Sequence, residues 1–186
     1  AQPALSDTDL RSTCLEYLSA AFCALMKNDL SGQSLSTVCL QSCQLQESRF
    51  AGADLSGARM DGSNLMQTHF EATRMVGVQA PRASFLSARF DACDASNANF
   101  TGAMFYNAQL AQSCFAGARL AGSNWQKSRV QNAQFAHADL SNTRFDHSRM
   151  VQTSFARASL DRSSFHHAEL TRVNLGGASR KGQQGT

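Results

Sequence analysis

The sequence has few charged residues, no long apolar run and no CxxC pair of cysteines. Charged residues make up 17% and apolar residues 42% of its 186 positions, which excludes a highly charged disordered chain and leaves a rather neutral surface. The longest apolar stretch, Leu15 to Met26, is interrupted by polar residues and is too short to span a bilayer. No charged segment followed by an apolar core opens the chain, so we expect no secretory signal. We therefore expect one folded domain without a membrane span.

The six cysteines form no CxxC pair and no regular disulfide spacing. We therefore expect reduced thiols and a cytoplasmic protein, with export by a secretion system that needs no cleavable signal as the alternative. The first residue is Ala1 rather than Met, which is compatible with a processed product or with a domain of a longer polypeptide. The net charge of +3 is far below that of a typical nucleic-acid-binding module, so nucleic-acid binding is not expected.

The dominant feature of the sequence is a period of five residues. Every fifth residue from Leu45 to Leu175 is apolar, which makes 27 apolar residues in succession, a run that chance would give about once in ten billion trials. The residue two positions before each of these is always small. Five residues rotate a helix by about 140° and turn a straight strand to its other face, so neither element fits. The chain must turn once per unit, with a short extended side and two corner residues.

Stacked units of this kind bury one continuous apolar column and pair the backbone of each coil with the coils above and below. The fold class predicted from the residues is therefore an all-β solenoid. The units at 53–57 (Ala-Asp-Leu-Ser-Gly), 138–142 (Ala-Asp-Leu-Ser-Asn) and 98–102 (Ala-Asn-Phe-Thr-Gly) resemble the A-(D/N)-(L/F)-x-x signature of pentapeptide-repeat proteins. This resemblance implies a right-handed quadrilateral β-helix with four units, or about twenty residues, per coil.

The two ends depart from the repeat. Between Arg11 and Lys27, apolar residues fall at helical spacing behind the N-cap candidates Ser6 and Asp7, which predicts a short α-helix that caps the first coil. We expect residues 1–27 to form this N-terminal segment, residues 28–177 to form about seven coils, and the Gly- and Gln-rich residues 178–186 to form a flexible tail.

No signature of catalysis or nucleotide binding is present: the sequence lacks GxxxxGK[ST], GxGxxG and G-x-S-x-G motifs. His147 and His167 lie twenty residues apart and are expected to stack in adjacent coils, with His166 beside them. A transition-metal site there is conceivable, but no further ligand completes a four-ligand shell, and a solvated polar ladder is the simpler interpretation. We expect no enzyme activity, no cofactor and no metal.

Two outward surfaces are candidates for binding a protein partner. One face carries arginines just before the large core residue in several coils, which predicts an anion-binding column; they are Arg49, Arg89, Arg129 and Arg149. Arginine stems that simply cover the rod are the alternative. Three apolar residues share one corner in successive coils, with a fourth close by, and form the second candidate; they are Met66, Leu86, Tyr106 and Met104.

The function predicted from these observations is that of a rigid, non-enzymatic scaffold for a protein partner, with a monomer as the expected state. Two alternatives remain open from the family resemblance. Some pentapeptide-repeat proteins protect DNA gyrase by mimicking duplex DNA, but a mimic needs a strongly negative surface and this chain is net positive. The other alternative is the interaction domain of a bacterial secretion-system effector or adaptor.

Overall fold

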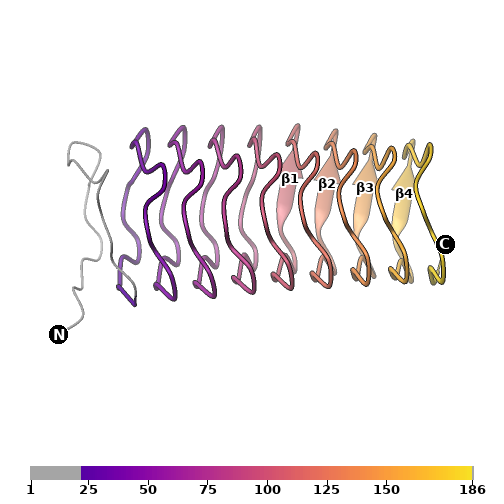
Figure 1. Ribbon diagram of the computed structural model, residues 1–186, viewed down its shortest axis with the longest axis horizontal. Coiled ribbons are helices and arrows are strands. Elements are labelled where there is room, and N and C mark those ends of the chain that lie inside the picture. Colours follow the sequence, from indigo (N-terminus) through magenta and orange to yellow (C-terminus); the bar gives the residue numbers. More distant parts are fainter. Residues whose placement is uncertain (1–21, 186) are drawn as a thin grey trace.

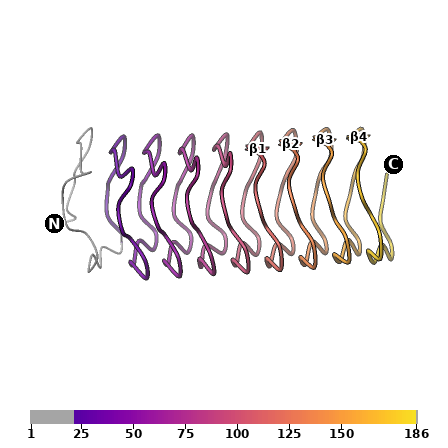
Figure 2. The same cartoon turned by 90° about the horizontal axis from the view of Figure 1, so that it is seen from above.

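The computed structural model describes residues 22–185, which form a rod of stacked coils with the first and last described residues at opposite ends of the rod (Figures 1 and 2). The outward residue of each unit pairs in parallel with the residue twenty positions later, from Ala24 with Gln44 to Ser164 with Gln184. Residues 22–185 therefore make about eight coils of four units each. The predicted all-β solenoid is confirmed, and the described residues contain no helix.

The backbone of each unit is hydrogen-bonded to both neighbouring coils. The amide of Asp54 donates to the carbonyl of Gln33 in the preceding coil at 2.9 Å, and the amide of Leu55 donates to the carbonyl of Arg74 in the following coil at 2.7 Å. The same pattern repeats along the rod, so the buried backbone groups find partners although the sides are only about three residues long. Regular stacking of this kind makes each face a straight column of residues spaced twenty apart in sequence.

Each corner consists of two residues, and the second has a positive φ at every corner from Phe22 to Gly182. At most corners the amide of the residue after the corner donates to the carbonyl of the large core residue before it, as the amide of Gln33 does to the carbonyl of Leu30 at 3.3 Å. This hydrogen bond and the positive φ together define a type II turn. The outward Asp or Asn of the repeat supports this turn, because its side chain accepts the amide two residues later, as Asp54 does from Ser56 at 2.9 Å. The recurring A-(D/N)-(L/F) pattern of the units thus has a local physical cause.

One face carries regular strands in its second half. They are β1 (Gln109–Ala111), β2 (Arg129–Gln131), β3 (Arg149–Val151) and β4 (Glu169–Thr171), which form a parallel sheet in the order β1-β2-β3-β4 (Figure 1). Their register sets Arg129 directly beside Arg149, and Arg149 beside Glu169. The outward side chains of this face are therefore held in one line.

The interior is a continuous stack of mostly Leu, Met and Phe side chains with a single Trp. Phe105 is fully buried between Phe85 and Trp125, with ring centroids 5.0 Å and 4.1 Å away and ring planes within 12° and 10° of parallel. The buried indole Nε1 of Trp125 donates to the hydroxyl of Ser123 at 2.8 Å, so its polar group has a partner. The small residue of each unit leaves the room that these rings need.

Several Ser and Thr residues at the small position satisfy their buried hydroxyls by a common rule: the hydroxyl donates to the carbonyl 23 residues earlier in the chain. Ser48 follows it, because its Oγ donates to the carbonyl of Leu25 at 2.7 Å and accepts the amide of Asn28 at 3.1 Å. Ser128 and Ser148 occupy the same column and are equally buried, but their hydroxyls have no hydrogen-bond partner. An orphaned buried hydroxyl is a destabilising feature.

We expect Ser48→Ala and Ser148→Ala to have different effects on stability. Ser48→Ala removes two hydrogen bonds and should lower the free energy of unfolding by about 1–2 kcal/mol. Ser148→Ala removes an unsatisfied hydroxyl and should leave the stability unchanged or raise it by up to about 1 kcal/mol. Urea denaturation of the two variants measures the difference, and an equal loss in both would contradict this account of the column.

The repeat extends further at both ends than expected. Residues 22–27, the last part of the predicted capping helix, form repeat coil instead: Cys23 and Leu25 are buried in the small and large positions, whereas Phe22 is 61% exposed at a corner. The rest of that helix, residues 11–21, lies outside the described residues. Residues 178–185, expected as a tail, continue the stack, because Ser179 pairs with Ser159 and Gln184 with Ser164. Within the part of the chain that the structure describes, no helix could cross a membrane.

Candidate partner-binding surface

The apolar corner, defined by Met66, Leu86, Tyr106 and the adjacent Met104, lies in three consecutive coils as predicted. The amide of Gln67 donates to the carbonyl of Leu86 at 2.8 Å, and the amide of Ser87 donates to the carbonyl of Tyr106 at 2.9 Å, so the three corner residues are direct neighbours. Met66, Leu86 and Tyr106 are half-buried, and Met104 is 40% exposed. The patch therefore combines firmly packed apolar side chains with one accessible thioether.

The apolar corner ends where charge begins. In the next coil the ammonium of Lys127 lies over the ring of Tyr106, 5.3 Å from its centroid. Further along the same corner, Asp146 is buried, and its carboxylate accepts hydrogen bonds from three neighbouring residues. At the other end, Met26 is 37% exposed in the same column, but Gln46 separates it from Met66. The contiguous apolar surface is thus confined to the middle of the rod.

The four arginines lie in one column as the sequence predicts, but they differ in their surroundings. Arg89 donates to Asp91 at 2.8 Å and lies 3.6 Å from Glu71, and His69 contacts the same Glu71 at 3.0 Å. The hydrogen bond to Asp91 also raises the pKa of Arg89 above its usual range. In this part of the column, acidic residues at the adjacent corner offset the positive charge.

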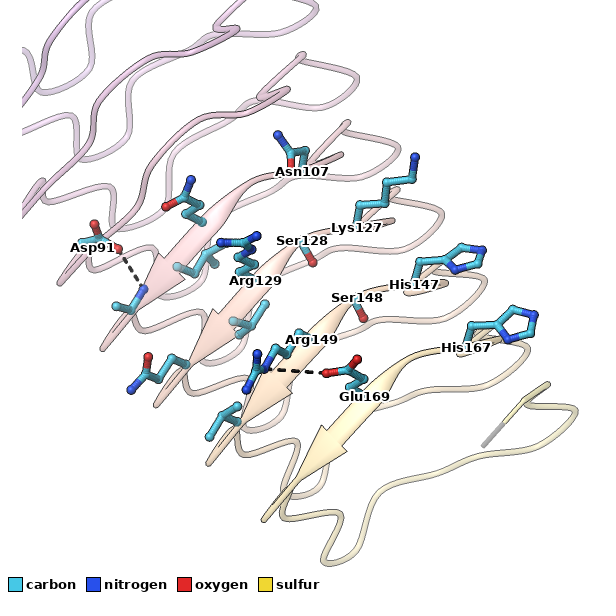
Figure 3. A pocket seen from close by; sticks show the side chains of 16 residues that line it. Asp91, Asn107, Lys127, Ser128, Arg129, His147, Ser148, Arg149, His167 and Glu169 are labelled. Atoms are coloured by element: carbon cyan, nitrogen blue, oxygen red, sulfur yellow. Dashed lines mark hydrogen bonds and ion pairs between the residues drawn. The ribbon is translucent and has the colours of Figure 1, made fainter.

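The second half of the same face is a shallow hollow over β1–β4, with a volume of about 1000 Å³ (Figure 3). Asn107, Lys127, His147 and His167 stand in a row along one rim, while the side chains of the strands lie beside them (Figure 3). The residues that define this basic hollow are Lys127, Arg129, His147, Arg149, His167 and Glu169.

The cations of the basic hollow are weakly compensated. Among residues 22–185, neither Lys127 nor Arg129 has a carboxylate within ion-pair distance. Arg149 lies 3.8 Å from Glu169, but these side chains are 69% and 74% exposed, and an ion pair so open to water contributes little. At the other end, a carboxylate oxygen of Asp91 accepts the amide of Ala111 at 3.1 Å. The hollow is therefore a positive surface with one carboxylate near each end.

The predicted histidine ladder is present. The rings of His147 and His167 are stacked, with centroids 5.0 Å apart and planes within 16° of parallel. No group of three or more His, Cys, Asp or Glu side chains suited to a metal occurs among the described residues. The two histidines are best described as part of the polar rim of the hollow.

The structure thus divides the sequence-predicted surface residues into two groups. The apolar corner stays together, and Arg129 and Arg149 share the basic hollow, whereas Arg49 and Arg89 do not line it. Lys127 was not among the predicted residues, because it lies at a corner and not on the arginine face. The sequence could have indicated it, because a corner residue such as Lys127 and the outward residue two positions later, Arg129, line the same surface.

A family model described as pentapeptide repeats matches eight copies in this chain, at residues 43–78, 83–120, 113–150 and 138–177. No curated protein matches the sequence. Among solved structures, a trypsin-treated form of QnrB1, a plasmid-mediated fluoroquinolone resistance protein, is 19% identical, with a TM-score of 0.65 over 90% of this chain and 88% of that one. HetL, from the cyanobacterium Nostoc sp. strain PCC 7120, is 17% identical, with a TM-score of 0.49 over 98% and 85% of the two chains. At such identities the similarity to QnrB1 concerns the fold alone.

Proposed function

Because the chain belongs to the pentapeptide-repeat family, we propose that it is a non-enzymatic scaffold, a rigid rod that binds a protein partner through its outer surface. The observation that carries this proposal is the apolar corner, where Met66, Leu86 and Tyr106 adjoin one another on a surface whose corners are otherwise mostly small or polar. A contiguous apolar patch rimmed by polar residues is typical of a protein interaction site.

The fold favours this role because the corner is already rigid before any partner arrives. The backbone of each corner residue is hydrogen-bonded to the adjacent coils, and the half-buried side chains have little freedom left to lose. A preorganised surface binds more tightly than a flexible one of equal area, because less conformational entropy is lost on association. Tyr106, held by the cation of Lys127, supplies the kind of aromatic anchor that often dominates binding energy at interfaces.

We expect Leu86→Asp to abolish partner binding while the rod stays folded. Asp occupies the same corner position in other units, including Asp61 and Asp91, so the backbone accommodates it. The matched control is Val76→Asp, which places the same charge at the same position of the unit but on a different corner. Quantitative affinity capture with the wild type and both variants measures the effect. The proposal is supported if partners are lost with Leu86→Asp and retained with Val76→Asp. It is contradicted for the apolar corner if all three proteins capture the same partners.

A second candidate is protection of DNA gyrase, which the family resemblance implies. QnrB1, which shares the fold, is a plasmid-mediated fluoroquinolone resistance protein, so fluoroquinolones are the drugs with which to test it. Against it stands the charge of the rod: residues 115–175 carry eight basic and four acidic side chains, the opposite of a duplex-DNA mimic. Bacteria that express the chain should keep their susceptibility to a fluoroquinolone, and purified gyrase should supercoil DNA normally in its presence. Protection in either assay at micromolar protein would establish the second candidate and displace the first.

A further inference from the structure

We propose that the basic hollow over β1–β4 binds a short acidic peptide segment of the partner. This inference rests on the proposed scaffold function, and it names the chemistry of what a second surface recognises. The hollow lies on the face that follows the apolar corner along the chain, and Lys127 links the two by contacting Tyr106. One partner can therefore engage both surfaces from the same side of the rod.

The charges of the hollow carry the argument. Lys127 and Arg129 come from the same coil, Arg149 follows in the next, and only Arg149 is near a carboxylate. Cations that have no nearby carboxylate and are held in fixed positions by a sheet attract acidic groups, and a guanidinium group can bind a carboxylate in a bidentate manner. Clusters of this kind are a recurrent means of recognising acidic motifs.

The ends of the hollow limit the length of what it binds. The rim from Lys127 to His167 spans two coil steps, or roughly 10 Å at a sheet spacing of about 4.8 Å, which corresponds to about three residues of extended peptide. At one end of this stretch a polyanion would meet Glu169, in the same coil as His167, and beyond the other end it would meet Asp91 with the neighbouring Glu71. The surface therefore suits a short acidic segment rather than a long, uniformly charged polymer.

The lining of the hollow also disfavours single-stranded nucleic acid. Such ligands are held by aromatic side chains on which the bases stack, in addition to contacts with phosphates. No Phe, Tyr or Trp lines the hollow, whose only rings are those of His147 and His167 along its rim. Carboxylates need no stacking surface, so the observed residues are sufficient for an acidic peptide.

Fluorescence anisotropy with three labelled probes tests the inference: hexaglutamate, hexalysine and a six-nucleotide oligothymidylate. We expect hexaglutamate to bind the wild-type protein at 50 mM NaCl, more weakly at 300 mM NaCl because exposed charges are screened, and more tightly than the other two probes. The double variant Lys127→Glu/Arg129→Glu should weaken hexaglutamate binding by at least about tenfold, since it replaces two attractive charges with repulsive ones.

The double variant Arg119→Glu/Arg157→Glu is the matched control. It makes the same charge change at one outward and one corner position on other faces, and it should alter the affinity by less than about twofold. Glu already occurs in both columns of the test variant, at Glu47 and Glu169, so folding should be retained. If it is lost, Lys127→Gln/Arg129→Gln provides the same comparison without charge reversal.

Three results would overturn the inference: no hexaglutamate binding, an equal loss in both double variants, or tighter binding of oligothymidylate. Leu86→Asp separates this inference from the proposed scaffold function. If that variant loses the partner while hexaglutamate fails to bind the wild type, the scaffold stands and the hollow is rejected. If hexaglutamate binds as expected and Leu86→Asp keeps the partner, the hollow stands and the apolar corner is rejected.

Discussion

Phe105→Asp is expected to unfold the central coils of the rod. Phe105 is fully buried and stacked between Phe85 and Trp125, so the substitution removes both ring contacts and places a carboxylate where no partner exists. Truncation of a buried Phe alone costs about 3–5 kcal/mol, and an unpaired buried charge adds several more. Because each coil is supported only by its neighbours, loss of a central rung divides the stack into two shorter pieces.

Trp125 is the only tryptophan in the chain and stacks on Phe105, so its fluorescence reports directly on this rung. We expect a red-shifted emission and a non-cooperative or absent thermal transition for Phe105→Asp. The control is Phe105→Leu, because Leu occupies the same column at Leu45 and Leu65; it should cost only about 1–2 kcal/mol. A folded Phe105→Asp protein with native fluorescence would show that the ring is not in the interior.

Asp146→Ala is expected to cause the second largest loss of stability, about 3 kcal/mol. Asp146 is only 8% exposed, and its carboxylate holds three coils together. It accepts hydrogen bonds from the side-chain amide of Gln126 at 3.1 Å, from the hydroxyl of Ser164 and from the backbone amide of His166 at 3.1 Å. Removal of an acceptor leaves these donors without partners, which costs about 1–3 kcal/mol for each that stays buried. Asp139→Ala is the control, because the side-chain hydrogen bonds of Asp139 remain within its own unit, to Ser141. It should cost less than about 1 kcal/mol.

The contribution of Asp146 should also depend on pH. Burial acts to raise the pKa of Asp146, but the hydrogen bonds from Ser164, Gln126 and the His166 amide outweigh it, so the pKa lies below its usual value. An unfolded Asp has a pKa of about 3.9, so the stabilisation is fully present above about pH 5 and is lost as the pH falls through the lower, folded-state pKa. Urea denaturation at pH 7 and pH 3 should show a smaller gap between wild type and Asp146→Ala at pH 3. A gap that is equal or larger at pH 3 would contradict the assignment.

The architecture could be predicted from the sequence because one physical constraint repeats in every unit. A large apolar residue at every fifth position and a small one two residues earlier predict a solenoid, and the family resemblance adds that each coil has four sides. Both positions are buried along most of the rod, and they are partly buried in its last coil. The ends were less predictable. Phe22, Leu25 and Met26 all fit a helical spacing, whereas only Leu25 falls on the apolar position of the five-residue period. The hydrogen bonds to the next coil, such as that from the amide of Phe22 to the carbonyl of Gln41, nevertheless place these residues in the repeat.

The outward surface could be predicted only as columns of residues. A step of twenty residues correctly placed Met66, Leu86 and Tyr106 on one corner and the arginines on one face. It could not show that Asp91 and Glu71 offset the charge of Arg89 while Arg129 has no such neighbour, because these contacts cross a corner or join adjacent coils. Which arginines of the column are free of a neighbouring carboxylate could therefore be seen only in the three-dimensional structure.

The central claim is that twenty residues of chain advance the rod by one coil. It can be measured directly by double electron–electron resonance between spin labels at Ser34 and Gln134 and between labels at Ser34 and Asn174, in a variant whose native cysteines are replaced by alanine. All three residues lie exposed in one column. At about 4.8 Å per coil, the account predicts separations of about 24 Å and about 34 Å. Separations that do not differ by about 10 Å, or a broad distribution for either pair, would contradict it.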